Sequence, residues 1–174
     1  MKDMIGKRVP DTIFKDVYLT DITTADYFAG KRVILYSIVG AFKPSLDATI
    51  PSFELLYHEF RSQHKIDDIY CISVNDPFVM NAWKENQKLN NVKVIADGNG
   101  EFTYSMGMFV AKHNIYMNWR SWRYAAIVDD GVIEAWFEEP GKQDLTDEDT
   151  YKETSAETVM NYLRALSVEK ERGK

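Results

Sequence analysis

Cysteine is almost absent from this chain, because Cys71 is the only one in 174 residues. A single cysteine excludes any disulfide within the chain. It is also typical of proteins from a reducing compartment, so we expect the protein in the cytoplasm. The apolar neighbours of Cys71, at 69–72, predict a buried strand in which the thiol is inert packing.

Long apolar runs and positive charge are scarce as well. No apolar run approaches the about 20 residues that span a membrane, and residues 1–6 contain no apolar signal-peptide core. The net charge is −6 and the isoelectric point about 5.1. This acidic balance argues against binding to nucleic acid or to an anionic membrane.

Two kinds of ligand-binding motif are also missing. The sequence contains no glycine-rich loop of the P-loop or dinucleotide-binding type. Its three histidines are scattered and form no His-x-x-x-His pair, which argues against a zinc site. We therefore expect neither a cofactor nor a metal.

The patterns that are present predict strands alternating with helices. Short apolar runs predict buried strands at 32–39, 66–74 and 92–96. Helical spacing of apolar residues predicts helices at 45–62, 77–89 and 154–166, with Asp76 and Ser155 as caps. This order predicts one α/β domain over residues 1–174, with a mixed central sheet flanked by helices.

Weaker signals fill the rest of the chain. They predict a short hairpin at 12–19, a brief helix or turn at 21–28 and a short helix at 102–109. Asp129-Asp130-Gly131 is a hairpin signature between runs at 121–128 and 131–138. The acidic residues of 144–153 predict a solvated loop before the last helix.

The segment 33–60 is the one around which we expect a site to form. An apolar strand leads directly into the turn 40–45, and a helical pattern follows. A strand that turns into a helix directs several backbone N–H groups at one place, and such a place favours an anion.

The turn Val39-Gly40-Ala41-Phe42-Lys43-Pro44-Ser45 resembles the active-site loop of the type-5 (type II) peroxiredoxins. Similar blocks occur at 72–80, 82–83, 96–98 and 120–124, so the resemblance covers roughly residues 5–166. It implies a thioredoxin-like fold and reduction of hydrogen peroxide and organic hydroperoxides. It also implies a homodimer and a thiol reductant such as glutathione, glutaredoxin or thioredoxin.

The reactive cysteine of that family is missing here. Its place falls on Leu46 when counted from Gly-Ala-Phe, or on Ser45 when counted back from Ile50-Pro51. The second register requires a one-residue deletion, but it also aligns the following helix, so we slightly prefer it. By the same resemblance, the shielding proline is replaced by Val39, and the threonine is replaced by Lys43 or falls in the gap. The arginine is retained as Arg123.

Each candidate residue also has a structural interpretation. Ser45 is better explained as a helix cap than as a nucleophile, because a serine hydroxyl needs a positioned base. Arg123 fits an anion site and a structural ion pair equally well. Lys43 fits a solvated lysine better than an anion ligand. The aromatic cluster of Tyr116, Met117, Trp119 and Trp122 predicts core packing or a dimer face.

Three functional hypotheses follow. In the first, the chain is a peroxiredoxin homologue without peroxidase activity that is kept for binding. In the second, it is a divergent one-cysteine peroxidase in which Cys71 attacks the peroxide. In the third, it is a module that docks another protein.

Overall fold

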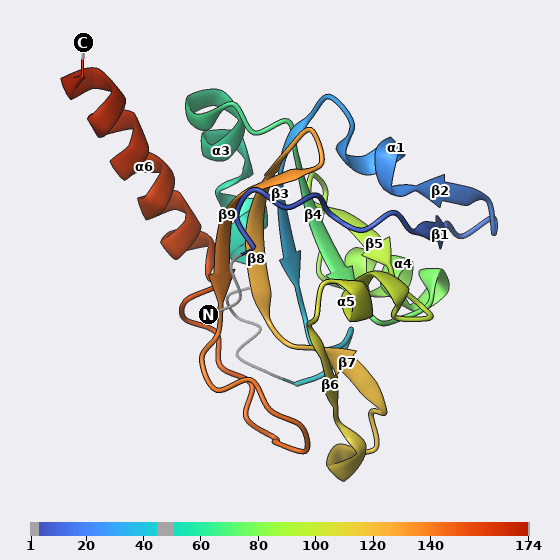
Figure 1. Cartoon of the computed structure of the whole chain (residues 1–174). Coiled ribbons are helices and arrows are strands. Elements are labelled where there is room, and N and C mark those ends of the chain that lie inside the picture. Colours follow the sequence, from blue (N-terminus) through green and yellow to red (C-terminus); the bar gives the residue numbers. More distant parts are fainter. Residues whose placement is uncertain (1–3, 45–50, 174) are drawn as a thin grey trace.

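Five strands form the central sheet, in the order β5-β4-β3-β8-β9. The computed structural model describes residues 4–44 and 51–173. The strands are β3 Arg32–Ser37, β4 Asp68–Ser73, β5 Lys93–Ala96, β8 Tyr124–Asp129 and β9 Val132–Glu138. β3, β4 and β5 run parallel, whereas β8 and β9 are antiparallel to their neighbours. The expected mixed sheet flanked by helices is therefore confirmed (Figure 1).

β3 lies at the centre because its side chains suit burial on both faces. Val33, Ile34 and Leu35 are all 0% exposed. Successive side chains of a strand point to opposite faces, so Ile34 and Tyr36 enter one core and Val33 and Leu35 enter the other. A run of consecutive β-branched and apolar residues is what such a strand requires.

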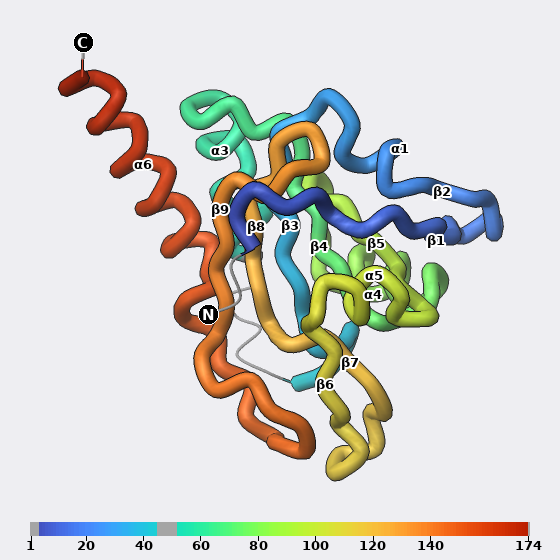
Figure 2. The backbone as a smooth tube through the Cα atoms, viewed as in Figure 1, coloured from blue at the N-terminus to red at the C-terminus, as the bar shows by residue number. Residues whose placement is uncertain are grey.

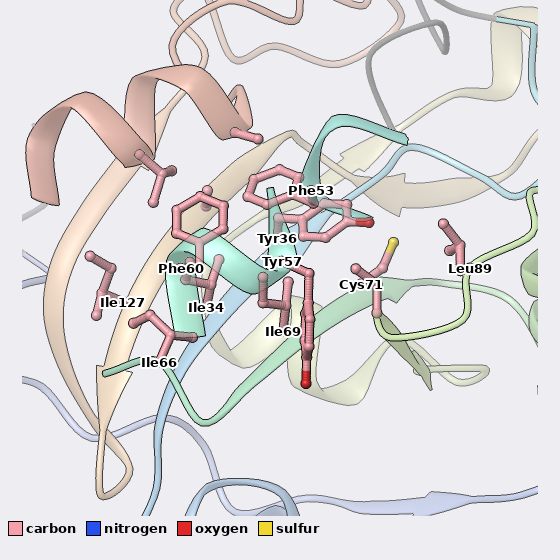
Figure 3. Close-up of a cluster of buried hydrophobic side chains, with 14 of the residues drawn as sticks. Ile34, Tyr36, Phe53, Tyr57, Phe60, Ile66, Ile69, Cys71, Leu89 and Ile127 are labelled. Atoms are coloured by element: carbon pink, nitrogen blue, oxygen red, sulfur yellow. The ribbon is translucent and has the colours of Figure 1, made fainter. Parts of the chain in front are cut away.

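Helices cover both faces of the sheet. Residues of the first core come from α2 Pro51–Leu55, α3 Tyr57–His64, α4 Pro77–Asn86 and α6 Ala156–Arg172. Figure 3 shows part of this core, in which Phe53 stacks on Tyr36 with ring centroids 4.1 Å apart. Residues of the second core come from β1 Ile13–Lys15, α1 Thr24–Phe28 and α5 Glu101–Ser105.

The N-terminal segment lies along the start of β9. The N–H of Gly6 donates to the carbonyl of Ile133 at 2.8 Å, and the N–H of Ile133 donates to that of Lys7 at 2.8 Å. The tube in Figure 2 shows this segment crossing the β8–β9 end of the sheet before it reaches β1.

Both predicted helix caps are present. The Asp76 carboxylate accepts the N–H groups of Phe78 and Val79, each at 2.9 Å, and Pro77 occupies the first turn of α4. Ser155 accepts the N–H of Thr158 at the start of α6. α6 begins two residues later than predicted and continues to Arg172 rather than ending at Leu166.

The helix predicted at 45–62 is interrupted. Its described part consists of α2 and α3, separated by Leu56, which has ψ 1° instead of the helical value of about −42°. The N–H of Phe60 still donates to the carbonyl of Leu56 at 3.0 Å, so the hydrogen bonding stays helical. α3 ends at His64, because Lys65 adopts the left-handed conformation. The predicted residues 45–50 lie outside the described part of the chain.

Three other boundaries were wrong. The helix predicted at 102–109 is α5, and it ends early because Gly107 has φ +72° and β6 Phe109–Ala111 follows. The strand predicted at 121–128 is split into β7 Trp119–Ser121, which pairs with β6, and β8 in the central sheet. The first hairpin pairs β1 with β2 Asp21–Thr23, so α1 begins only at Thr24.

Candidate functional site

Arg123 occupies the short link between β7 and β8, where the chain leaves the small β6–β7 sheet and enters the central one. The end of β3 fixes this link. The hydroxyl of Ser37 donates to the carbonyl of Trp122 at 2.9 Å, and the N–H of Tyr124 donates to Ser37 Oγ at 3.0 Å. The indole N–H of Trp122 donates to the carbonyl of Glu139 at 2.7 Å. The guanidinium therefore starts from a rigid backbone.

The carboxylate of Asp149 binds this guanidinium. Arg123 Nε donates to Asp149 Oδ1, and Arg123 Nη2 donates to Oδ2 at 3.0 Å. A second cation reaches the same carboxylate, because Lys43 Nζ lies 2.9 Å from Asp149 Oδ2. The guanidinium also lies over the ring of Tyr151, 5.4 Å from its centroid. One anion is thus held between two cations that come from distant parts of the chain.

The three side chains are largely hidden from solvent. Their exposed fractions are 4% for Arg123, 6% for Asp149 and 13% for Lys43. Burial opposes ionisation of Asp149, but the hydrogen bonds and positive charges of Arg123 and Lys43 outweigh it and lower the pKa of that carboxyl. The Asp149 carboxylate is therefore charged at neutral pH.

The segment that carries Asp149 is residues 139–155, here called the strap, which joins β9 to α6. Lys112 anchors one part of it, since its ammonium group donates to the carbonyls of Thr146 at 2.7 Å and Glu148 at 3.3 Å. The Lys112 side chain is fully buried and lies over the Trp122 ring, and burial lowers its pKa. A buried lysine thus stabilises the approach of the strap to Arg123.

Glu139 anchors the other end of the strap. Its Oε1 accepts the N–H of Lys152 at 2.7 Å, and the N–H and hydroxyl of Thr154 at 2.9 Å each. A cavity of about 10 Å³ lies between Val39, Trp122, Arg123, Glu139 and the strap residues 148–150. A space of this size holds about one water molecule. Little room is left on the strap side of Arg123.

Two expectations about charged residues were therefore wrong. Lys43 is not a solvated lysine, since it is mostly buried and paired with Asp149. The acidic segment 144–153 is exposed along most of its length, but Asp149 turns inward. The carboxylate of Asp144 also has a structural role, because it accepts the N–H of Ala111 at 2.8 Å.

Cys71 lies in β4, directly opposite Tyr36 in β3. It is 0% exposed and belongs to the first core. Figure 3 shows the Tyr36 hydroxyl directed toward its sulfur. Burial and the neighbouring thiol raise the pKa of Tyr36 well above its usual value. The only sulfhydryl of the chain therefore lies inside the protein.

The turn after β3 is described only as far as Pro44, so Ser45 and Leu46 lie outside the described residues. Its first part is fixed by close contacts. The N–H of Ala41 donates to Asn75 Oδ1 at 3.0 Å. A Cβ on Gly40 would lie 2.7 Å from Met117 Cε, so a larger residue there would require the flexible end of that methionine to move.

The predicted aromatic cluster divides into two parts. Trp122 is core, with 4% of its surface exposed, whereas Tyr116 is 99% and Trp119 43% exposed. Trp119 stacks on Phe109 with centroids 5.6 Å apart, and Tyr104 meets Phe109 edge-on. Tyr104, Phe109, Tyr116 and Trp119, together with His113, are here called the aromatic surface.

Among residues 4–44 and 51–173, no group of three His, Cys, Asp or Glu side chains could hold a metal ion. Within the same ranges, no helix has the length and hydrophobicity needed to cross a membrane.

Comparison with known proteins decides the family. The sequence model of the Redoxin family matches residues 4–154. The chain is 55% identical over 146 residues to a peroxiredoxin of Rhizobium etli, covering 83% of this chain and 81% of the relative. The chain belongs to the peroxiredoxin family.

Other peroxiredoxins agree over nearly the whole length. One from Synechocystis is 40% identical over 174 residues, covering 92% of each chain. The crystal structure of a Plasmodium falciparum antioxidant protein, a 1-Cys peroxiredoxin, superposes with a TM-score of 0.88 at 34% identity and covers 95% of this chain and 99% of that one. The expected family and its thioredoxin-like fold are thus confirmed.

Sequence reasoning missed Asp149 as a site residue. The prediction that Arg123 fits an ion pair named no partner. Five acidic residues lie within 144–153, and their pattern does not distinguish the one that turns inward. The one indication in the sequence was Arg123, because a buried arginine needs an anion as its partner.

Proposed function

We propose that this peroxiredoxin no longer reduces peroxides and acts by binding. The family reaction needs a thiolate at the start of the first long helix, where this sequence has Ser45 or Leu46. The observation that carries the proposal is the position of Cys71, the only sulfur nucleophile, which is 0% exposed within a central strand. A thiol buried in apolar surroundings is inaccessible to a peroxide and inert.

The charges around Arg123 support this proposal. In the reaction implied by the resemblance, the guanidinium positions a peroxide and stabilises the thiolate. In this protein, Nε and Nη2 of Arg123 bind Asp149. In the family reaction, the thiolate becomes a sulfenic acid, which a thiol reductant then returns to the thiol. A carboxylate has no counterpart of this cycle. We therefore expect Arg123 to bind an anion without taking part in a redox step.

The test is a steady-state peroxidase assay on the purified wild-type protein. Hydrogen peroxide and an organic hydroperoxide are each supplied with glutathione, glutathione plus glutaredoxin, or thioredoxin. We expect the consumption rate to equal that of the blank. Intact mass after peroxide treatment should show Cys71 unmodified. Turnover that is lost in a folded Cys71→Ala variant would instead support the one-cysteine peroxidase.

Two cysteine variants complete the test. Ser45→Cys and Leu46→Cys each place a thiol at one of the two positions allowed by the loop alignment. We expect the variant in the preferred register, Ser45→Cys, to be oxidised by peroxide to a sulfenic acid, and Leu46→Cys to react more slowly. Both are compared with wild type by mass spectrometry, so that Cys71 serves as the internal control.

The aromatic surface favours a second role, in self-association. Exposed aromatic side chains are enriched at protein interfaces. Tyr116 and Tyr104 are 99% and 70% exposed, and Trp119, which is 43% exposed, stacks on Phe109. We propose that this surface forms a homodimer, as the family resemblance suggests. The cytoplasm remains our proposed location, because a single thiol without disulfides suits a reducing compartment.

A further inference from the structure

A pocket of about 190 Å³ lies where α6 passes the end of α3. Figure 1 shows α3 and the C-terminal part of α6 at the same end of the sheet. An ion pair joins the two helices, with Arg164 Nη2 2.6 Å from Glu59 Oε1. The side chains that matter for its chemistry are three cations, one imidazole and two leucines: Arg32, Lys65, Lys170, His64, Leu163 and Leu166.

The lining of this pocket is positively charged, although the whole chain has a net charge of −6. None of the described residues that line it is acidic. Arg32 is already neutralised, because its guanidinium binds both oxygens of Glu134. Lys65 and Lys170 form no ion pair in the described part of the chain, although the charge of Lys170 helps to lower the pKa of Glu134. Two ammonium groups are therefore available to an anion.

His64 adds a polar group that the protein leaves unsatisfied. The residue is 8% exposed, and its Nε2 is buried without a hydrogen-bond partner among the described residues. Its backbone is fixed, since Arg32 Nη1 donates to its carbonyl at 2.6 Å. Burial lowers the pKa of His64; the charge of Glu59 opposes this, and those of Arg164 and Arg32 add to it. A buried polar nitrogen needs a partner, and an anion in the pocket would also favour the charged imidazole.

These groups suit a phosphate better than a carboxylate. A carboxylate is best bound by the planar fork of an arginine, and Glu134 already occupies the fork of Arg32. Lysine binds phosphate as a point charge, and two lysines match the dianion of a phosphomonoester. The pocket has room for about six water molecules, more than an inorganic phosphate fills. Leu163 and Leu166 give it an apolar wall.

We propose that the pocket between α3 and α6 binds a small phosphomonoester. Lys65, Lys170 and His64 hold the phosphate group. Leu163 and Leu166 contact a short apolar substituent of the ester.

This site is separate from the one around Arg123. Arg32 is the first residue of β3, whereas Ser37, which holds the link that carries Arg123, is the last. The two sites therefore lie at opposite ends of the same strand. The inference does not depend on the proposed loss of peroxidase activity.

The experiment is an NMR titration of the ¹⁵N-labelled wild-type protein at pH 7.5. Ethyl phosphate, inorganic phosphate and propionate are each added at constant ionic strength. We expect ethyl phosphate to give saturable shifts of the backbone N–H signals of residues 63–65 and 166–170. It should bind at least threefold more tightly than inorganic phosphate, because its ethyl group covers the leucines. It should bind at least tenfold more tightly than propionate, which has the same ethyl group but a single charge.

Lysine variants test the two ammonium groups. Lys65→Asn and Lys170→Gln should each weaken the binding of ethyl phosphate at least fivefold. Asparagine is used because Lys65 has φ 55°, a left-handed conformation that asparagine tolerates. Lys88→Asn is the matched control, because Lys88 is exposed and also has φ 55°, but it does not line the pocket. It should bind ethyl phosphate as wild type does.

The imidazole of His64 supplies a second measurement. Its signals are followed from pH 8 to pH 5 with and without sodium sulfate, a tetrahedral dianion whose charge is constant in this range. We expect sulfate to raise the pKa of His64, because a nearby anion favours the charged imidazole. The signals of His58 and His113, which do not line the pocket, serve as internal controls.

Shifts that do not saturate, or that spread evenly over the surface, would overturn the proposal. The same holds for equal or tighter binding of inorganic phosphate or propionate, for equal weakening by Lys88→Asn, and for a His64 titration that sulfate leaves unchanged. Peroxide consumption plays no part in these results, so this site and the proposed loss of activity can fail separately.

Discussion

Asp149 shows how strongly one side chain can depend on its partners. Its carboxylate would lose hydration on burial, yet its pKa is lowered because Arg123 and Lys43 bind the charged form. Replacing one member of a buried ion pair costs about 3–5 kcal/mol. The local sequence of the strap contains nothing that predicts this energy.

We expect Asp149→Asn to lower the free energy of unfolding at pH 7 by about 3–5 kcal/mol. The folded-state pKa of Asp149 lies below that of an unfolded aspartate, about 3.9. A depressed carboxyl pKa contributes stability that is complete above the unfolded value and is lost as the pH falls through the folded value. The difference between wild type and variant should therefore shrink as the pH falls below about 4.

Urea unfolding from pH 7 to pH 2.5 measures this difference. Glu134→Gln is the matched comparison, because Glu134 pairs with Arg32 but is 31% exposed. We expect it to cost less than Asp149→Asn at neutral pH, since solvent screens a partly exposed pair. If the difference in free energy of unfolding between wild type and Asp149→Asn stayed constant down to pH 2.5, the charge of Asp149 would not be the cause of the destabilisation.

At the scale of elements, the sequence predicts the helix caps, but it does not predict where a helix or a strand is interrupted. Asp76 and Ser155 cap α4 and α6 because a short polar side chain before a helix meets the first N–H groups wherever the helix lies. The separation of α2 from α3 at Leu56 and the split between β7 and β8 depend on neighbouring elements. Apolar spacing continues across both of these breaks.

We expect Asp76→Ala to destabilise the protein by about 1 kcal/mol, because the N–H groups of Phe78 and Val79 lose their side-chain acceptor. The control is Asn81→Ala in the middle of the same helix. It removes a contact with Glu85 worth about 0.2–0.5 kcal/mol but gains helix propensity, so it should be near neutral. Urea unfolding of both variants checks this, and equal losses would argue against the cap.

At the scale of the whole molecule, the aromatic surface is the feature that the monomer leaves unexplained. Tyr116 and Trp119 lie close together in sequence near the β6–β7 sheet, and both are exposed. Aromatic residues of this kind dominate the binding energy of many interfaces. Tyr116 is 99% exposed and contributes little to the stability of the monomer, whereas Trp119 also stacks on Phe109. Urea unfolding of each variant therefore accompanies the measurement of association.

We expect wild type to behave in light scattering as a dimer of the 20.2 kDa chain. Tyr116→Ser combined with Trp119→Ser should weaken association at least about tenfold, the effect of about 1.4 kcal/mol. Tyr18→Ser is the control, because Tyr18 is 86% exposed outside the aromatic surface. A monomeric wild-type protein, or equal weakening by both changes, would contradict a dimer through this surface.

The sequence by itself determined the main strands and helices of the central sheet in their order, the mixed sheet and the family. These follow from periods of two and 3.6 residues, from caps and from short motifs, all of which act over a few neighbouring residues. The burial of Cys71 followed in the same way from the apolar strand around it.

Only the tertiary structure decided which acid meets Arg123. Lys43, Arg123 and Asp149 belong to three segments far apart in the chain, and they converge because the turn after β3, the start of β8 and the strap share one end of the sheet. Periodicity contains no information about such a meeting. An ion pair forms where burial removes water from charges that the fold has already brought together.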